Sequence, residues 1–387
     1  MKKRAIVLGN GLVGSVIALD LAADEEYEVV VCDANAETLA ETRKKSGGKI
    51  AVRSDVDFAS PASITEAVRG FDICFGAVPG FLGYKMLGAV IKAGVGISDI
   101  SFMPEDYREW DQEAKKAGVV AYEDIGVAPG ATSVLIGHAC SLLDTVDDAI
   151  CYVGGLPTDP KPPFNYKVVF SADDVIEEYV RPARCKKNGE IVTVPALSNC
   201  EIIDFDIPGL KLPRMEGFFT DGSRTLLDTI PAQNVIEYTL RYPGTARDLE
   251  LLRSIGLFDK EPVKIKGVDV SPRDLFGHLA YPMMKLGENE NEFTFFQVNV
   301  TGAKDGKRIK HTFSLYDERD MKTGYPSMSR TTGFSCAIAG RMIAEGLLDS
   351  VGVNPPEHIS KSKTATERLI NELKKRGVKI LQSQETL

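Results

Sequence analysis

Basic runs, clustered histidines and membrane-length apolar runs are all missing from this 387-residue sequence. Its net charge is −9 at pH 7, and no basic stretch is long enough to indicate a nucleic-acid partner. The four histidines stand at scattered positions (138, 278, 311 and 358), so they form no zinc motif and no metal is expected. Only a short apolar run follows the first four residues before glycines begin, so we expect neither a signal peptide nor a membrane partner.

The cysteines also lack the pattern of a disulfide framework. All seven (32, 74, 140, 151, 185, 200 and 336) are irregularly spaced, odd in number and mostly inside apolar runs. This usage is typical of reduced core thiols and predicts a cytoplasmic protein. Hydrophobic residues make up 43% and charged residues 26%, which is ordinary for a globular protein, and the length allows two domains.

The stretch from Ala5 to Asp33 carries the strongest positive signal. It reads AIVLGNGLVGSVIALDLAADEEYEVVVCD, in which an apolar run precedes three glycines, a helical pattern, a second apolar run and an acid. This order matches the strand, turn, helix and strand of a dinucleotide-binding unit. A bare GxGxxG motif also occurs in ordinary turns, but here the flanking strands and the terminal acid favour nucleotide binding.

Each glycine of this turn has a physical role. Gly9 permits the tight turn after the strand, Gly11 lets a pyrophosphate approach the backbone, and Gly14 lets the helix pack closely on the strand. Asp33 follows the glycines by about twenty residues, where a carboxylate accepts hydrogen bonds from the adenosine ribose and repels a 2′-phosphate. Because Ala34 and not an arginine follows Asp33, we expect NAD rather than NADP as the cofactor.

Strand and helix patterns alternate as far as residue 131 and predict a Rossmann doubly wound parallel sheet in an α/β fold. Ser60-Pro61 marks a helix start, and Gly70 and Gly118 mark helix ends. The expected NAD site combines the glycine turn with successive strand ends, and comprises Gly9, Asn10, Gly11, Leu12, Val13, Gly14, Asp33, Ala34, Asp55, Val56, Ala77, Val78, Pro79, Ile100 and Ile125.

After residue 131 the pattern changes to one dominated by strands. We expect strands at 148–154, 165–170, 190–194 and 200–205, helices near 225–240 and 245–256, and a hairpin of 292–301 with 308–316. The sequence therefore predicts a Rossmann domain at 1–131 completed by a return helix at 328–350. It also predicts an inserted α+β domain at 132–327 for substrate binding and oligomerisation, and a C-terminal helical tail at 351–387.

Several later motifs together resemble the saccharopine dehydrogenase family, and most closely its lysine 6-dehydrogenase branch. They read GNGLVG, YEDIGVAPG, GGLPTDPKPPFNYKVVFS, EYVRPARCKKNGE, FFTDGSRTLLDT, TLRYPG and SMSRTTGFSCAIAGRMI, and span about residues 4–350. The resemblance implies an active site between the two domains and NAD-dependent oxidation of an amine. Saccharopine-forming members have a loop resembling GLDPG, with an acid where this chain has Ala128, and this departure favours a smaller substrate.

Amine oxidation needs a neutral amine whose carbon is held about 3–3.5 Å from the nicotinamide. The ε-ammonium of lysine has a pKa of about 10.4, so a base or a desolvated pocket must remove its proton. Asp124 and Asp99 are the candidate catalytic residues, because both stand where strands of a parallel sheet end. Each also has a structural interpretation as a turn or capping aspartate. Ser101 and Phe102 follow Asp99 and are expected to line the substrate pocket.

An amino-acid substrate also needs a partner for its α-carboxylate. Arg181 and Arg224 are candidates because a guanidinium binds a carboxylate through two hydrogen bonds, although arginines more often form ordinary ion pairs. Asp221 and Thr225, beside Arg224, are candidates to receive the α-ammonium. Lys167 is a less favoured base, because its ammonium is expected to reach solvent from an apolar strand.

The histidines at 311 and 138 lie in apolar patterns, where a core position is favoured over a catalytic one. Taken together, these observations favour an NAD-dependent lysine 6-dehydrogenase that forms the 6-semialdehyde and then a cyclic piperideine carboxylate. A saccharopine or carboxynorspermidine dehydrogenase, and a non-catalytic NAD-binding regulatory protein, are the alternatives. The apolar strand 292–301 and its hairpin partner, together with the resemblance, predict a homodimer or higher homo-oligomer joined through the second domain.

Overall fold

A computed structural model describes residues 2–170, 172–287 and 289–387 of the chain. It divides into two compact units, which are described separately. Unit 1 comprises Met1–Ser141 and Met328–Lys379, and unit 2 comprises Leu142–Ser327 and Ile380–Leu387.

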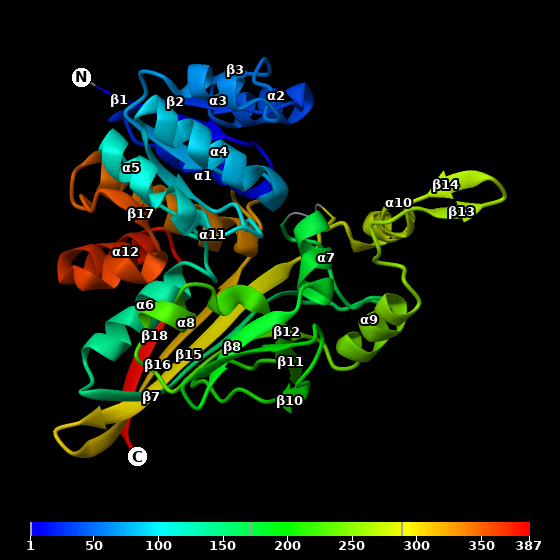
Figure 1. Cartoon of the computed structure of the whole chain (residues 1–387), viewed down its shortest axis with the longest axis vertical. Coiled ribbons are helices and arrows are strands. Elements are labelled where there is room, and N and C mark those ends of the chain that lie inside the picture. Colours follow the sequence, from blue (N-terminus) through cyan, green and yellow to red (C-terminus); the bar gives the residue numbers. More distant parts are fainter. Residues whose placement is uncertain (1, 171, 288) are drawn as a thin grey trace. The chain divides into compact units, whose positions relative to one another are not determined.

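Unit 1 is built on a seven-stranded parallel sheet (Figure 1). The strand order is β17-β6-β5-β4-β1-β2-β3, and every pairing is parallel. The order reverses between β1 and β4, which is the position where open sheets of this kind bind ligands. The strands are β1 (Lys3–Leu8), β2 (Tyr27–Cys32), β3 (Ile50–Arg53), β4 (Ile73–Gly76), β5 (Gly96–Asp99), β6 (Val120–Tyr122) and β17 (Gly352–Asn354). The predicted Rossmann fold class is confirmed.

Helices of unit 1 begin and end where capping residues predict. Ser60 caps α3 and is followed by Pro61 at the first helical position, while Gly70 and Gly118 adopt positive φ angles of 75° and 67° after α3 and α5. The helices are α1 (Leu12–Ala22), α2 (Ala36–Lys45), α3 (Pro61–Val68), α4 (Gly80–Ala93), α5 (Asp111–Ala117), α6 (Ala131–Ser141), α11 (Ser327–Ala344) and α12 (Lys363–Lys375), with short 3₁₀ turns η1 (Tyr107–Trp110) and η3 (Pro356–Lys361).

Helix α11 is the expected return helix, and its small residues let it approach unit 1 closely. A Cβ added at Gly340 would lie 2.0 Å from the ring of Phe75 on β4, and one at Gly333 would lie 3.3 Å from Val16 of α1. The hydroxyl of Ser98 on β5 donates to the carbonyl of Cys336 in α11. These contacts explain why residues 331–347 carry so many small side chains.

Unit 2 contains a nine-stranded mixed sheet. Its main path is β10-β11-β12-β7-β15-β16-β18, and β8 pairs with both β12 and β9. Only β7 and β12 pair in parallel along this path. The strands are β7 (Thr145–Pro157), β8 (Ala183–Lys187), β9 (Glu190–Val194), β10 (Glu201–Ile203), β11 (Met215–Phe219), β12 (Asn234–Arg241), β15 (Glu292–Lys304), β16 (Lys307–Glu318) and β18 (Ile380–Thr386).

The predicted hairpin of 292–301 and 308–316 is present as β15 and β16, joined at Asp305 and Gly306 with positive φ. We expected the apolar face of this hairpin to form the oligomer interface. In the structure that face is not exposed. Phe296, Val298 and Val300 are fully buried, and β15 itself pairs with β7 and β16 inside the unit's own sheet.

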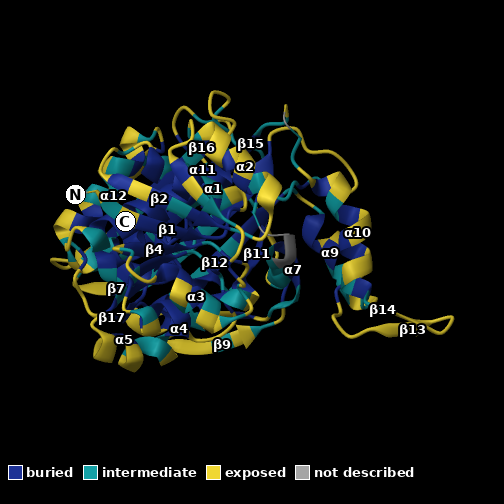
Figure 2. Ribbon diagram, turned by 90° about the horizontal axis from the view of Figure 1, so that it is seen from above, coloured by how far each residue is buried: buried dark blue, intermediate teal, exposed yellow. Residues whose placement is uncertain are grey.

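Helices of unit 2 are fewer than its strands in the described part of the chain. They are α7 (Ala172–Val180), α8 (Leu226–Thr229), α9 (Thr245–Ser254) and α10 (Pro272–Met284), with a 3₁₀ turn η2 (Asp221–Ser223). A separate two-stranded hairpin, β13 (Val263–Ile265) with β14 (Val268–Val270), precedes α10. Figure 2 shows the strands of the large sheet mostly buried and this hairpin exposed.

Two secondary-structure predictions in unit 2 were wrong. Residues 165–170 form no strand; Tyr166 and Val169 are buried from an irregular segment in which Asn165 has a φ of 51°. Residues 225–240 are not one helix, because Pro231 cannot continue α8 and the chain then pairs as β12. Val235, Glu237 and Thr239 are buried on one face of β12, but two of the three are polar, so the sequence shows no apolar alternation there.

The expected boundaries also differ from those of the units. Unit 1 extends to Ser141 rather than 131, because α6 packs against η3 of the same unit. Residues 351–387 form no separate helical tail. Instead β17 completes the parallel sheet, η3 and α12 pack on unit 1, and β18 pairs with β16 in unit 2.

Within the described residues, no helix combines the length and apolar character needed to cross a membrane. The seven cysteine sulfurs, all of which lie in the described part of the chain, form no disulfide bond.

Candidate dinucleotide and substrate sites

The glycine turn after β1 has the geometry that its sequence predicts. Gly9 has a φ of 100°, and a Cβ there would lie 2.3 Å from the carbonyl oxygen of Ala77. A Cβ on Gly14 would lie 2.1 Å from the carbonyl oxygen of Gly9. Both positions therefore exclude any side chain, Gly9 for the turn and Gly14 for the packing of α1 against it.

Gly11 differs from the other two glycines, because a Cβ there would meet no atom within 4 Å. It is the N-cap residue of α1, so the N–H groups and positive dipole end of this helix begin at an open space. The protein's own packing does not require glycine at this position. An open cradle at the N-terminus of a long helix, beside the switch point of the sheet, fits the pyrophosphate of a dinucleotide.

Asp33 stands at the end of β2 in a defined orientation. Its Oδ2 accepts a hydrogen bond from the backbone N–H of Asn10 (2.6 Å), and its Oδ1 accepts one from the N–H of Asn35 (2.8 Å). The side-chain oxygen of Asn10 in turn accepts from Thr42 of α2. The carboxylate is therefore tied to the glycine turn itself, and keeps lone pairs for ribose hydroxyls.

The other predicted NAD residues lie at this same edge of the sheet. Ala77, Val78 and Pro79 follow β4, Ile100 follows β5, and Ile125 follows β6. Leu12 begins α1 with an exposed side chain, and Val13 and Ala34 lie beside the glycine turn and Asp33. Val56 is buried and Asp55 is exposed, both just beyond β3, where Asp55 binds Arg53 through two hydrogen bonds.

A pair of buried carboxyl groups lies behind this edge. Asp99, the last residue of β5, is fully buried, and its Oδ1 accepts hydrogen bonds from the N–H and the hydroxyl of Ser101. Burial raises the pKa of Asp99, while hydrogen bonds with Glu123 and Ser101 oppose that rise. Glu123 is also fully buried. Two carboxyl groups that share a hydrogen bond must also share a proton.

This arrangement assigns Asp99 a positioning role, because its carboxyl orders the loop through Ser101. The Ser101 hydroxyl is engaged with Asp99 rather than directed to a ligand. Phe102 follows in the same loop and is partly exposed. A direct catalytic role for Asp99 stays a prediction, and sequence reasoning missed Glu123 although it precedes the predicted Asp124.

Asp124 follows β6 and has a left-handed backbone with a φ of 58°. Its side chain is nearly buried, and its charge raises the pKa of Asp99. The next residue, Ile125, donates its N–H to the carbonyl of Asp99 and joins the two strand ends. Aspartate is among the non-glycine residues that adopt this backbone region most readily, so the conformation also fits a turn aspartate, and the catalytic role of Asp124 stays a prediction.

Unit 2 brings the two predicted arginines close together. The pKa of Arg181 is lowered, first by burial and then by the positive charge of Arg224. Arg224 is buried and adopts a φ of 44° directly after η2. This backbone conformation costs roughly 1–3 kcal/mol for such a residue. Two guanidinium groups within electrostatic reach of each other in a buried place favour an anion between them.

The acids nearest these arginines bind other cations. Glu177 contacts Arg273 at 2.5 Å and Lys260 at 3.1 Å, and lies 4.0 Å from Arg181. Asp221 accepts three hydrogen bonds from Arg184, through its backbone N–H and its guanidinium. The charges of Glu177, Asp221 and Asp174 also act on Arg181, so part of its positive charge is balanced within the unit.

The role expected for Asp221 needs correction. Both its oxygens bind Arg184, which the sequence did not mark as a partner, so Asp221 anchors η2 rather than receiving an ammonium group. Thr225 is buried directly after Arg224, and its carbonyl accepts from the hydroxyl of Thr229 in α8. The missed signal was the arginine at 184 in the motif RPARCKK.

Glu237 is a second residue that sequence reasoning missed. A Cβ added at Gly222 would lie 1.7 Å from its Oε1, so any side chain at this point of the turn before Arg224 would force the Glu237 carboxylate to move. The hydroxyl of Thr220 also donates to Glu237. The turn DGSR is therefore built on β12, the strand that was mistaken for a helix.

The two histidines lie in the apolar elements that were expected, whereas the ammonium of Lys167, which was expected to reach solvent, is bound within the protein and its side chain is 13% exposed. The Lys167 ammonium binds the carbonyls of Met283 and Lys285 and the carboxylate of Glu290. His311 is buried on β16, opposite Val300. His138 lies on α6, where burial lowers its pKa.

These features define a dinucleotide-binding oxidoreductase scaffold with a second, mixed-sheet unit. Comparison with known proteins agrees. Residues 5–122 match the family model described as the saccharopine dehydrogenase NADP binding domain, and residues 126–378 match the saccharopine dehydrogenase C-terminal domain. The two models together span most of the chain, which belongs to the saccharopine dehydrogenase family.

Individual relatives are distant but cover the whole length. The chain is 22% identical to the saccharopine dehydrogenase [NADP(+), L-glutamate-forming] of Schizosaccharomyces pombe, over 97% of both chains. It is also 22% identical to the carboxyaminopropylagmatine dehydrogenase of Synechocystis, over 90% of this chain and 91% of that one. The solved saccharopine dehydrogenase (L-Glu forming) of Saccharomyces cerevisiae has the same fold, with a TM-score of 0.79 over 100% of both chains at 21% identity.

Proposed function

We propose that this protein oxidises the ε-amine of L-lysine with NAD, giving the 6-semialdehyde and ammonium, after which the product cyclises to piperideine carboxylate. The observation that carries the proposal is the pair of the partly buried Arg181 and the buried Arg224, whose charges act on each other in unit 2. Such a pair can bind the α-carboxylate of an amino acid, whereas a simple amine has no carboxylate for it to bind.

Each of the chain's own groups has a defined task in this reaction. Arg181 and Arg224 hold the carboxylate, so that binding energy far from the reacting carbon fixes its position. Asp124 accepts the proton that the ε-ammonium must lose before oxidation, and Asp99 with Glu123 keeps the loop beside it in place. Bound NAD supplies the hydride acceptor. Water then hydrolyses the substrate imine, releasing ammonium.

The choice of NAD rests on Asp33. Its carboxylate is held in one orientation by the backbone N–H groups of Asn10 and Asn35. A 2′-phosphate beside it would be repelled by this fixed negative charge. Arg53, which pairs with Cys32 across the sheet, directs its guanidinium to Asp55. The family model is named for NADP, so this preference is a departure that we propose for this chain.

A second candidate is a saccharopine-type dehydrogenase, which couples or splits a secondary amine. It is favoured by the names of the relatives that match along the whole chain. Against it stands Ala128, which is part of a turn that closes through Gly126 and Gly130 and offers no charged side chain. At this position the chain therefore lacks one of the side chains expected to recognise a substrate with additional carboxylates.

A panel of substrates with each cofactor tests the proposal. We expect reduction of NAD with L-lysine, little reduction with cadaverine, which lacks the carboxylate, and little with saccharopine. Rates are read as absorbance of the reduced cofactor. Saccharopine with NADP as the preferred pair would establish the second candidate, and no turnover with any pair would favour a non-catalytic NAD-binding protein.

A further inference from the structure

Arg224 occupies a backbone conformation that glycine normally fills. Its φ of 44° and ψ of −122° are followed by −69° and −21° at Thr225. These two pairs of angles are close to those of a type II′ turn, whose first central residue is usually glycine because a Cβ is crowded there. The chain has an arginine at this position, although glycine would fit the backbone better.

A buried arginine in such a turn is unfavourable in two ways. Its backbone is strained, and its charge is removed from water. Strain of this kind persists only where the surrounding structure fixes the residue, and it is concentrated at ligand-binding and catalytic sites. Another part of unit 2 must therefore hold this turn in place.

Strand β12 packs against η2, the start of this turn, and Glu237 makes the contact. The backbone N–H of Thr220 donates to the carbonyl of Glu237 (3.3 Å), and the Thr220 hydroxyl donates to its Oε1 (3.2 Å). The three atoms nearest to a Cβ built on Gly222 all belong to the Glu237 carboxyl group, at 1.7, 2.3 and 2.4 Å. The carboxyl group therefore lies directly against the backbone that leads into Arg224.

Glu237 is itself held firmly by the large sheet. It is 6% exposed, and its strand pairs with β7 on one side and, from Tyr238 onward, with β11 on the other. The hydroxyl of Thr220 also lies 2.9 Å from that of Thr239, two residues further along β12. Because the strand is fixed on both sides, the turn is released only if the Glu237 side chain itself withdraws.

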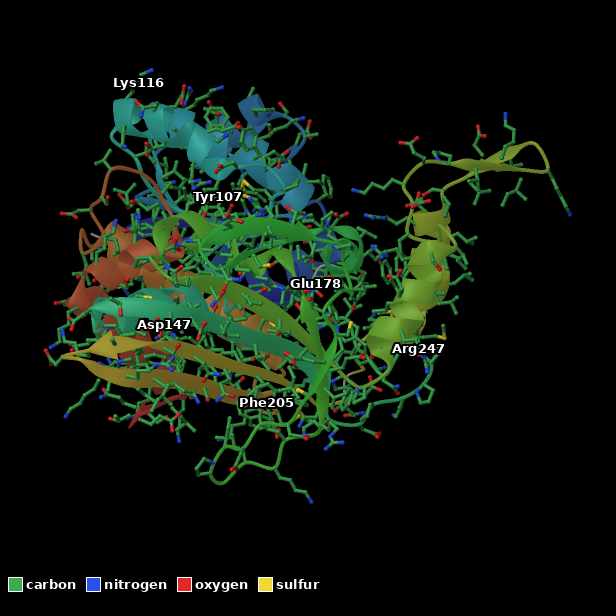
Figure 3. All side chains as sticks on the ribbon, turned by 60° about the horizontal axis from the view of Figure 1, so that its bottom comes forward. Tyr107, Lys116, Asp147, Glu178, Phe205 and Arg247 are labelled. Atoms are coloured by element: carbon green, nitrogen blue, oxygen red, sulfur yellow. The ribbon has the colours of Figure 1, made fainter. Side chains whose placement is uncertain are left out.

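The same strand also fixes the segment that leads to Arg181. The buried Arg241, the last residue of β12, binds Glu178 of α7 and donates to the hydroxyl of Tyr179 (3.2 Å). Figure 3 shows Glu178 beside the strands of the large sheet. Arg181 follows directly after α7. One strand therefore anchors both segments that carry the two arginines.

We propose that Glu237 is a positioning residue that holds Arg224 in its strained turn, so that the guanidinium is already fixed when the substrate arrives. An ordered arginine loses less conformational entropy when a carboxylate binds to it. The binding of the α-carboxylate of lysine by Arg224 rests on the function proposed above. The hold of Glu237 on the turn does not, because it consists of contacts inside unit 2.

Two substitutions of Glu237 separate its contact from its charge. Glu237→Gln keeps the length of the side chain and an oxygen for Thr220, whereas Glu237→Asp keeps the charge but withdraws it from Gly222 by one methylene. We expect Glu237→Asp to raise KM for lysine at least about tenfold with kcat within about twofold, and Glu237→Gln to keep KM within about threefold of wild type. The reverse order would show that Glu237 acts through its charge and would overturn the proposal.

Thermal unfolding without substrate tests the strain directly. Arg224→Gly should melt at least about 2 °C above Arg224→Ala, because glycine adopts this turn without strain. The difference should persist when Glu237→Gln is added and fall by at least half with Glu237→Asp, since a released turn can relax. Arg214, an exposed arginine bound to Asp204, is the control position, where glycine should melt no higher than alanine.

Gly222→Ala provides an independent variant at the same contact. Its added methyl group meets the Glu237 carboxyl group and forces it to move, so KM for lysine should rise as in Glu237→Asp. Equal melting temperatures of the two Arg224 variants, or a difference that Glu237→Asp leaves unchanged, would overturn the proposal. A protein whose melting temperatures follow the prediction but which does not oxidise lysine would support the role of Glu237 and refute the function proposed above.

Discussion

Gly9, Gly11 and Gly14 are distinguished by what a methyl group would meet at each. At Gly9 and Gly14 it meets carbonyl oxygens at 2.3 and 2.1 Å, and at Gly11 it meets nothing within 4 Å. Two of these glycines are therefore needed for the fold, whereas the third keeps a space open that the fold itself does not use. This difference is the clearest residue-scale sign of a bound dinucleotide.

The pair Gly11→Ala and Gly14→Ala separates these roles. Gly14→Ala should lose about 3 kcal/mol of stability through overpacking, or roughly 6–12 °C in Tm. Gly11→Ala should stay within about 1 kcal/mol of wild type, because its φ of −72° suits alanine, yet weaken NAD binding at least about tenfold. Thermal unfolding and cofactor titration measure both effects. Equal NAD affinity in Gly11→Ala and wild type would contradict the placement of the pyrophosphate.

Asp99 gives a pH-dependent prediction. Its pKa is raised in the folded protein, so its contribution to stability is full below the ordinary value of about 3.9 and is lost as pH rises through the folded value. Asp99→Asn keeps an acceptor for Ser101 and never ionises. The Tm of wild type should therefore fall more steeply with rising pH than that of Asp99→Asn. Parallel Tm curves from about pH 4 upward would show that Asp99 is not held neutral.

Elements with strong local signals were predictable from sequence. The β1-α1-β2 unit, the Ser60-Pro61 helix start and the hairpin of β15 and β16 all follow from periodicity and turn residues close together in the chain. Strand β12 was not predictable from sequence. The strands that pair with it, β7 and β11, come from other segments of the chain, and Leu226-Leu227 before it fits a helix. The partners Arg184 and Glu237 were missed for the same reason.

The prediction on substrate binding concerns the turn η2 and Arg224, which follows it. Arg181→Ala or Arg224→Ala should lose roughly 2–4 kcal/mol of transition-state stabilisation with lysine, because each removes a partner of a buried carboxylate. Cadaverine should be a poor substrate whose rate is nearly indifferent to these changes. Arg214→Ala, at an exposed arginine bound to Asp204, is the matched control and should behave as wild type. Folded variants with unchanged kcat/KM on lysine would refute the assignment.

The whole molecule combines a family fold with local departures from the family's pattern. The parallel sheet and the family models place the chain among the saccharopine dehydrogenases, and relatives match it from end to end. The reaction that we propose rests on a few side chains, namely Asp33 for the choice of NAD, and Ala128, Arg181 and Arg224 for a small amino acid as substrate. Sequence predicted these residues, but their mutual coupling required the fold.

Transfer of deuterium from lysine is the measurement that tests this account most directly. Lysine carrying two deuterium atoms on its ε-carbon is incubated with the protein and NAD, and both products are examined by mass spectrometry. We predict that one deuterium enters the reduced cofactor and one remains in the cyclic piperideine carboxylate, with ammonium released in equal amount. Lysine recovered unchanged, while saccharopine reduces NADP under the same conditions, would contradict the account.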